Sequence, residues 1–193
     1  MSDSLTNVNN FTCKTDGADL SLDFKRISFP DDKYEKKFIK SVKIMIRGSL
    51  EYKEWLDYLI HTKNLTQCLF TNEKLSECTI EFHHHPVSLE NIVTAVVDKF
   101  MDEKTMFSTA DVFLEIMKMH FSMKIGVVPM VTTLHQKFHN GFLSIPMDLV
   151  IGDYQWFMTH YPLRDQATET VNKYLTVKNT NHIGWNKDTY VLK

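Results

Sequence analysis

The chain carries the stretch Ile80-Glu81-Phe82-His83-His84-His85-Pro86, in which three consecutive histidines end a strand-like run and precede a proline. A second cluster, His135 and His139, lies further along, and the two clusters hold five of the nine histidines. Residues four apart on a helix share one face, so both imidazoles of this pair could reach the same ion. Neutral imidazole binds metal ions and also accepts protons near neutral pH. The two clusters therefore predict a metal site, whose simplest chemistry is metal-assisted hydrolysis of a phosphodiester.

Around these clusters the chain has the composition of an ordinary globular protein, with 193 residues, 43% of them hydrophobic and 24% charged. This length allows one domain, or one domain with an appendage. There is no apolar run long enough to span a bilayer, so we expect no membrane association. Residues 1–19 are polar and lack the apolar core of a secretory signal, which predicts a flexible N-terminal arm. Three cysteines cannot all pair, and this favours a reducing cytoplasm; they are Cys13, Cys68 and Cys78.

Hydrophobic periodicity predicts an α+β fold. Helices are expected over residues 50–62, 89–103, 109–120, 132–139, 153–161 and 163–177. Strands are expected over residues 20–24, 67–70, 78–82 and 142–146, and residues 125–130 form a strand or an extended loop. The runs 67–70 and 78–82 are expected to pair as a β-hairpin that ends at the histidine triplet. Residues 38–46 favour a strand in their later part, although the start of this segment could be helical.

A basic strip stands out against the net charge of −2. It comprises Lys33, Lys36, Lys37, Lys40, Lys43 and Arg47, opposed in that stretch only by Glu35. Such a strip can contact phosphates even when the whole protein is slightly acidic. The alternative is a solvated surface without a ligand.

The order of the two histidine clusters resembles that of the HNH endonucleases, also called ββα-metal or His-Me finger nucleases. The opening motif of that family is similar to residues 80–86, and its closing motif is similar to residues 128–141. The chain is also similar to HNH-type proteins of tailed bacteriophages, which share the stretches found here at 145–146 and 152–154. The resemblance covers roughly residues 48–161 and implies a ββα-metal core with a helical insertion and extra flanking helices.

The resemblance also implies a role for each histidine. His83, His135 and His139 would be metal ligands, and His84 would be the general base. A second register, with His84 as the ligand and His85 as the base, stays open. A site rich in histidine suits Zn²⁺, Mn²⁺ or Ni²⁺ better than Mg²⁺, which prefers oxygen ligands.

The expected organisation has four parts. A flexible arm (1–19) precedes a strand and helix that carry the basic strip (20–64). The HNH-like core (65–161) follows, with its helical insertion at about 88–121, and a C-terminal helix and tail (162–193) end the chain. Gly126 stands where the HNH family usually has an asparagine, nine positions before His135.

Two functions follow from these observations. The first is a metal-dependent endonuclease that hydrolyses DNA, encoded by a phage and acting in the host cytoplasm. In it, the phosphate contacts come from Lys36, Lys37, Lys40, Lys43 and Arg47. The second is a catalytically degenerate phage protein that keeps the fold to bind host or viral machinery, which the Gly126 replacement favours. A zinc hydrolase of another class is disfavoured because the chain lacks a His-Glu-x-x-His motif.

Overall fold

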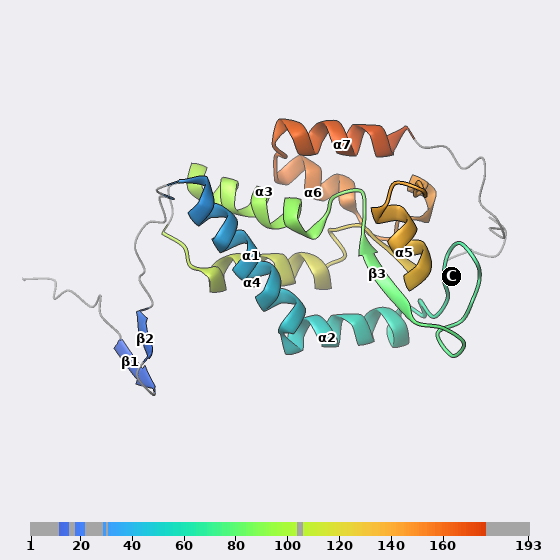
Figure 1. Cartoon of the computed structure of the whole chain (residues 1–193), viewed down its shortest axis with the longest axis horizontal. Helices are drawn as coiled ribbons and strands as arrows, with labels where there is room; N and C mark the ends of the chain where they lie inside the picture. The colour runs from blue at the N-terminus through green and yellow to red at the C-terminus, as the bar shows by residue number, and fades with distance from the viewer. Residues whose placement is uncertain (1–11, 16–17, 22–28, 30, 104–105, 177–193) are drawn as a thin grey trace, which may run out of the picture.

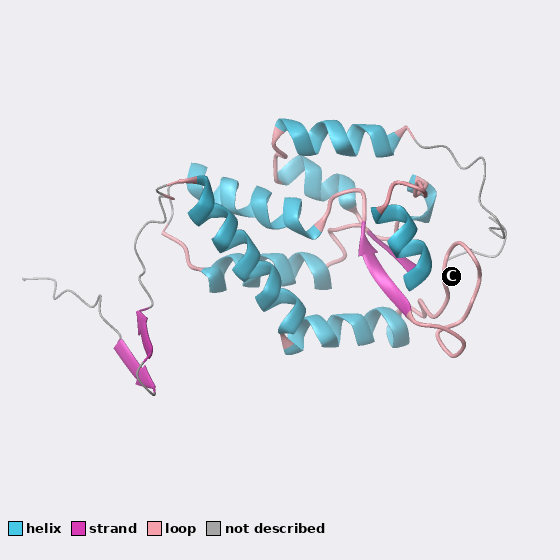
Figure 2. Cartoon of the chain, in the orientation of Figure 1, coloured by secondary structure: helices cyan, strands magenta, loops and turns pink. Residues whose placement is uncertain are grey.

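The computed structural model describes residues 12–15, 18–21, 29, 31–103 and 106–176. This part of the chain is mostly helical and contains two small antiparallel sheets, as Figures 1 and 2 show. The mixture of helix and strand agrees with the expected α+β class. None of the described helices is both long and apolar enough to cross a membrane. The arm expected over residues 1–19 lies outside the described residues, apart from short strand segments.

The elements follow one another in this order: β1 (Thr12–Thr15), β2 (Ala18–Ser21), α1 (Asp32–Gly48), α2 (Leu50–Asp57), the π-helical turn η1 (Tyr58–Thr62), β3 (Ile80–His84), α3 (Leu89–Asp102), α4 (Thr109–Phe121), β4 (Val127–Val131), α5 (Thr132–His139), the 3-10 turn η2 (Met147–Leu149), α6 (Tyr154–His160) and α7 (Asp165–Leu175). Strand β1 pairs with β2, and β3 pairs with β4. The strand expected over 20–24 overlaps the end of β2, and residues 22–24 lie outside the described part.

Serine caps begin three helices where the sequence predicts them. The side chains of Ser49, Ser88 and Ser108 each accept a hydrogen bond from the backbone N–H three residues later. At Ser108 the carboxylate of Asp111 also accepts from the Ser108 backbone N–H, which completes a capping box. These local bonds satisfy N–H groups that a helix leaves unpaired at its start, so the starts of α2, α3 and α4 are confirmed.

The strand expected late in residues 38–46 is wrong, because this whole segment lies inside α1. The buried side chains are those of Ile39, Val42 and Ile46, spaced by three and four residues, whereas Ile44 is 63% exposed. A spacing of three and four places side chains on one face of a helix. The basic strip therefore lies on a helix that packs against α3 and α4.

Strand β3 pairs with β4, and not with residues 67–70 as predicted. The register sets His83 opposite Val128. Residues 67–70 instead begin a compact loop, in which Gln67 and Lys74 form an isolated bridge. The apolar side chains of this loop are buried against β4, so their hydrophobicity reflects a place in the core and not a hairpin strand.

The main core joins α1, α2, α3 and α4 with residues of α6 and α7. The two helices that separate β3 from β4 in the sequence thus belong to this core. A smaller buried cluster lies between the loop that precedes β3, strand β4 and the segment around η2. Together they hold the β3–β4 pair on both sides, which fixes the position of the histidine triplet.

Helix α5 follows β4 without a linker, and it ends at Asn140 and Gly141 as expected. Gly141 has a φ of 76°, the left-handed conformation that glycine adopts after a helix. The strand expected over 142–146 is wrong, since this segment has no regular structure. The last helix is shorter than expected, and residue 177 lies outside the described part.

Candidate metal centre

Strand β3 and helix α5 lie side by side (Figure 1). This arrangement brings His83 next to His135 and His139. One ring nitrogen from each of the three lies within 4.8 Å of the other two. The ring centroid of His83 is 4.8 Å from that of His135 and 5.2 Å from that of His139. The structure therefore brings His83 of the first histidine cluster together with both histidines of the second. These three imidazoles could hold one metal ion.

The fold explains this convergence. Because β4 is antiparallel to β3 and runs directly into α5, the helix starts beside Ile80, the first residue of β3, and then runs along the strand. His135 and His139 are four residues apart on α5, and their Nε2 atoms are 2.9 Å apart. His83 is buried, His135 is half-buried and His139 is exposed, so the group opens to solvent on the helix side.

Glu81 contacts His135 and Thr132 of helix α5. It lies two residues before His83 and so projects from the same face of β3. Its carboxylate accepts from Nδ1 of His135 and, at 3.1 Å, from the hydroxyl of Thr132. A carboxylate that takes the Nδ1–H of a histidine leaves the Nε2 lone pair for a metal ion and makes it more basic. Glu81 is thus placed as a supporting residue for His135.

Burial favours the neutral form of His83 and of His139. It lowers the pKa of His83 to about 3, with further lowering by the neighbouring His135 and His85. The pKa of His139 is also lowered, by burial and then by His135. A neutral imidazole offers the lone pair that metal binding requires.

His84 points to the other face of β3, as the strand pleat dictates. Its ring stacks near Tyr52 and Trp55, with centroid distances of 6.5 and 6.2 Å. Its Nε2 lies 3.0 Å from Nε2 of His120 on α4. Burial, followed by the neighbouring His120, lowers the pKa of His84 well below its ordinary value.

His85 is 1% exposed and packs against Phe138 and Tyr174. Its Nε2 has no hydrogen-bond partner among the described residues. The ring centroid of His85 is 6.2 Å from that of His83, on the same face of the chain. The geometry groups His83, and not His84, with the pair on α5.

Gly126 has no room for a side chain. A Cβ atom there would lie 2.1 Å from the carbonyl oxygen of His85 and 2.6 Å from a methyl group of Val150. The carbonyl of Gly126 accepts the N–H of His85 at 3.0 Å. An asparagine side chain could not be accommodated here, so the glycine serves close packing at the end of β3.

A pocket of about 550 Å³ opens beside the candidate metal centre. Its lining includes His83, His84, His135 and His139 together with Lys43 and Arg47 of the basic strip. The three remaining lysines of the predicted phosphate-binding set line a different hollow nearer the start of α1; they are Lys36, Lys37 and Lys40. The structure thus brings part of the basic strip to the histidines and leaves part away from them.

Lys43 and Arg47 differ in how they are paired. The ammonium of Lys43 is 2.5 Å from a carboxylate oxygen of Glu90. For Arg47 the described residues show no ion pair, and its side chain is exposed. Arg47 is therefore the cation at this pocket that is available to an anionic ligand.

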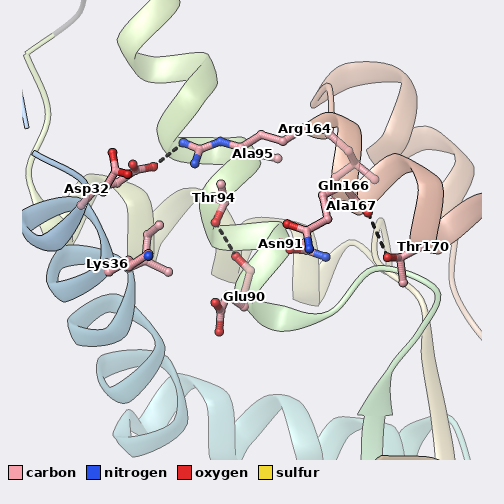
Figure 3. A pocket seen from close by; sticks show the side chains of 13 residues that line it. Asp32, Lys36, Glu90, Asn91, Thr94, Ala95, Arg164, Gln166, Ala167 and Thr170 are labelled. Atoms are coloured by element: carbon pink, nitrogen blue, oxygen red, sulfur yellow. Dashed lines mark hydrogen bonds and ion pairs between the residues drawn. The ribbon is translucent and has the colours of Figure 1, made fainter. Parts of the chain in front are cut away.

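A second cavity of about 470 Å³ lies between α1, α3 and α7 (Figure 3). Its guanidinium, from Arg164, is already bound by Asp98 and Glu35. The hydroxyls of Thr94 and Thr170 donate to carbonyls of their own helices. Because the Arg164 guanidinium and both threonine hydroxyls already have hydrogen-bond partners, we assign no ligand to this cavity.

The pairing of His120 with His84 is not among the contacts that the sequence predicts. The available signal was a histidine on the apolar face of a predicted helix. A buried imidazole needs hydrogen-bond partners, and two buried histidines are natural candidates for one another.

A sequence model of one protein family, described as bacteriophage G278-like virion protein, matches residues 1–192. No curated protein and no solved structure matches the chain. The family match confirms the expected relation to bacteriophage proteins.

Proposed function

Since the chain belongs to the bacteriophage G278-like virion protein family, we propose that it is a virion protein with an HNH-type, metal-dependent nuclease site. The observation that carries this proposal is the convergence of His83, His135 and His139 within 4.8 Å. Catalytic zinc sites commonly use three protein ligands and leave one position for water or substrate. Three imidazoles at the edge of an open pocket fit that description.

The order of elements around the site supports the same proposal. An antiparallel strand pair, β3 and β4, is followed at once by α5, which is the order of a ββα-metal core. Helices α3 and α4 would then be an insertion between the two strands.

In this proposal His83, His135 and His139 hold a divalent ion, with Glu81 orienting His135. The ion would offset the negative charge that develops on the phosphate oxygens. The resemblance implies His84 as the general base, and His84 lines the same pocket as the three proposed ligands. The nitrogen ligands favour Zn²⁺, Mn²⁺ or Ni²⁺ over Mg²⁺.

The exposed guanidinium of Arg47 favours an anionic ligand, and we propose DNA as the substrate. Arg47 is an exposed cation on the pocket wall that holds the histidines. A guanidinium can bind a phosphate through two parallel hydrogen bonds. The lysines at the other end of α1 would extend the contact along the backbone of the nucleic acid.

The proposal is tested by metal analysis and plasmid nicking on the full chain. Wild-type protein should retain a divalent metal and nick supercoiled DNA with Mn²⁺, Zn²⁺ or Ni²⁺. His139→Ala should lose most of the metal and the nicking, because it removes one of three ligands. His61→Ala, at an exposed histidine outside both clusters, is the matched control and should behave as wild type. Equal metal content in wild type and His139→Ala would contradict the metal site.

A non-catalytic virion protein is the second candidate. It is favoured by the close packing at Gly126 and by the 7% exposure of His84, which limits access to its ring. In that case the metal would only stabilise the fold. Retained metal without cleavage of DNA or RNA in any of the tested ions would support it.

A further inference from the structure

The pocket beside the candidate metal centre has an apolar wall that the proposed metal chemistry does not use. The apolar wall is formed by Tyr52 and Leu56 of α2 and by Phe82 of β3. All three side chains are half-buried and pack against the main core, so an edge of the core faces the pocket. The volume of about 550 Å³ lies within the range of pockets that hold a small organic ligand.

The charges at this pocket leave one cation for an anionic group. Lys43 is bound to Glu90, and the carboxylate of Glu81 accepts from His135. Arg47 is exposed, and the described residues show no ion pair for it. A pocket in which the carboxylates have partners and a guanidinium has none favours a ligand that carries a phosphate.

Arg47 lies near both the apolar wall and the candidate metal centre. Burial raises the pKa of Tyr52 to about 12, and the positive charge of Arg47 opposes that shift. The same charge helps to lower the pKa of His139, after burial and His135. Such effects require short separations, because salt screens distant charges. A phosphate bound by Arg47 would therefore lie close to the tyrosine ring and to the histidines.

Tyr52 gives the apolar wall an aromatic surface that core contacts hold in place. Its ring lines the pocket and packs on that of Trp55, with a centroid distance of 5.3 Å. A fixed aromatic ring is a surface on which a nucleic-acid base can stack, whatever the base, since every base has a flat face. The pocket thus offers a place for a base next to a place for a phosphate.

We propose that this pocket binds one unpaired nucleotide, with its phosphate at Arg47 and its base on the apolar wall. The substrate is then single-stranded DNA, or a DNA duplex at a position where a base is unpaired. Inside an intact duplex each base is paired and stacked, so its flat face is not available to the wall. The cleavage of this substrate rests on the proposed nuclease function, whereas the binding of the nucleotide does not.

The alternative is that the apolar wall is only an edge of the core and that Arg47 binds phosphate without regard to a base. Two probes that differ only in the base separate these roles: thymidine 5′-monophosphate and 2-deoxyribose 5-phosphate. Each is titrated into the ¹⁵N-labelled full chain with a chelator present, and backbone amide shifts report binding. The nucleotide should bind about 10-fold more tightly, since stacking of one base contributes a factor of that order. Equal affinities would overturn the proposal.

Two variants assign the two halves of the nucleotide. Tyr52→Leu keeps an apolar side chain and removes the ring, so it should weaken the nucleotide and leave the sugar phosphate unchanged. Arg47→Ala should weaken both probes. Tyr34→Leu, at an exposed tyrosine of α1, is the matched control and should bind both as wild type does. Equal weakening of both probes in a folded Tyr52→Leu would refute the stacking role, and the comparison of probes in wild-type protein requires no variant to fold.

The substrate class is tested by cleavage of labelled oligonucleotides with Mn²⁺, Zn²⁺ or Ni²⁺. A single strand should be cut at least about 10-fold faster than the same sequence in a duplex, because the duplex must first release a base. Supercoiled plasmid stays a substrate, since negative supercoiling favours opening of the duplex. Equal rates on single strand and duplex would overturn the substrate class. Cleavage of neither, together with tighter binding of the nucleotide than of the sugar phosphate, would contradict the nuclease proposal and support the nucleotide pocket.

Discussion

Glu81 shows how a single side chain links β3 to α5. Its carboxylate accepts from His135 and Thr132, both on the helix. The sequence alone places Glu81 only on the strand face of His83, because the partner of a strand residue depends on which helix packs there. The pairing with His135 makes Glu81 the residue that sets the orientation of the His135 ring.

Glu81→Gln should weaken metal binding about 10- to 100-fold, since the amide is a poorer acceptor for the His135 N–H. The measurement is a competition titration with a chromogenic chelator. Glu54→Gln, at an exposed position of α2, is the control. Unchanged affinity in Glu81→Gln would show that the carboxylate does not support the site.

Gly126 is the second residue whose identity has a clear physical reason. Gly126→Ala should lower the free energy of unfolding by at least about 2 kcal/mol, because the new Cβ would overlap the His85 carbonyl oxygen at 2.1 Å. Urea denaturation measures this. Gly48→Ala is the matched control: nothing lies within 4 Å of a Cβ there, and alanine at the end of α1 should be neutral or slightly stabilising. Similar stability of the two variants would contradict the packing argument.

Helix boundaries were predictable where the signal is local. The serine caps and the apolar spacing of α2, α3 and α4 lie within a few residues of each helix start, and the structure confirms them. Strand pairing was not predictable, because the partner of β3 is more than forty positions away and the loop at 67–70 has the same apolar character as a strand. In α1 the alternation of Val42, Ile44 and Ile46 also fits a helix with Ile44 facing solvent.

The candidate site was predictable to the same degree. Helical spacing alone predicts that His135 and His139 share one face. The strand-like run before the histidine triplet predicts that the triplet lies at the end of a strand. Two contacts join different elements: that of His84 with His120 and that of Glu81 with His135. Local sequence patterns therefore do not predict them. The division of the basic strip between two hollows likewise depends on how α1 packs.

Helix α1 should contribute to function through both of its ends. Arg47→Ala should lower nicking at saturating DNA and reduce the salt dependence of binding by about one charge, because it removes a cation from the pocket wall.

The combined change Lys37→Ala and Lys40→Ala should weaken DNA binding and its salt slope without lowering the maximal rate. Fluorescence anisotropy at several salt concentrations gives the slopes. An unchanged maximal rate in Arg47→Ala would exclude it from the site.

The molecule as a whole holds several histidines away from water, and this makes its stability sensitive to acid. Burial lowers the pKa of both His85 and His120 to about 4, below the ordinary value of 6.5. Below about pH 6.5 the unfolded chain therefore binds protons that the folded chain does not. The stability contributed by these residues is complete above that pH and is lost as the pH falls towards 4.

Without metal, each of these two histidines should reduce the free energy of unfolding by roughly 1.4 kcal/mol per pH unit between pH 6.5 and 4.5. Urea denaturation from pH 7 to 4.5 in the presence of a chelator tests this. His120→Gln should make the dependence shallower by about one proton, whereas His61→Ala should not. A stability that stays flat down to pH 5 would contradict the buried, neutral state of these rings.

The ligands at the candidate metal centre come from β3 and α5, with all of α3 and α4 between them in the chain. A bound ion would therefore act as a reversible cross-link that closes a long segment of polypeptide. Such a cross-link restricts the unfolded ensemble, and its chain-entropy effect grows with the logarithm of the enclosed length. Separation of α5 from β3 would then require release of the ion, so chelation should make local opening of this helix, seen by amide hydrogen exchange, more frequent than opening of α1.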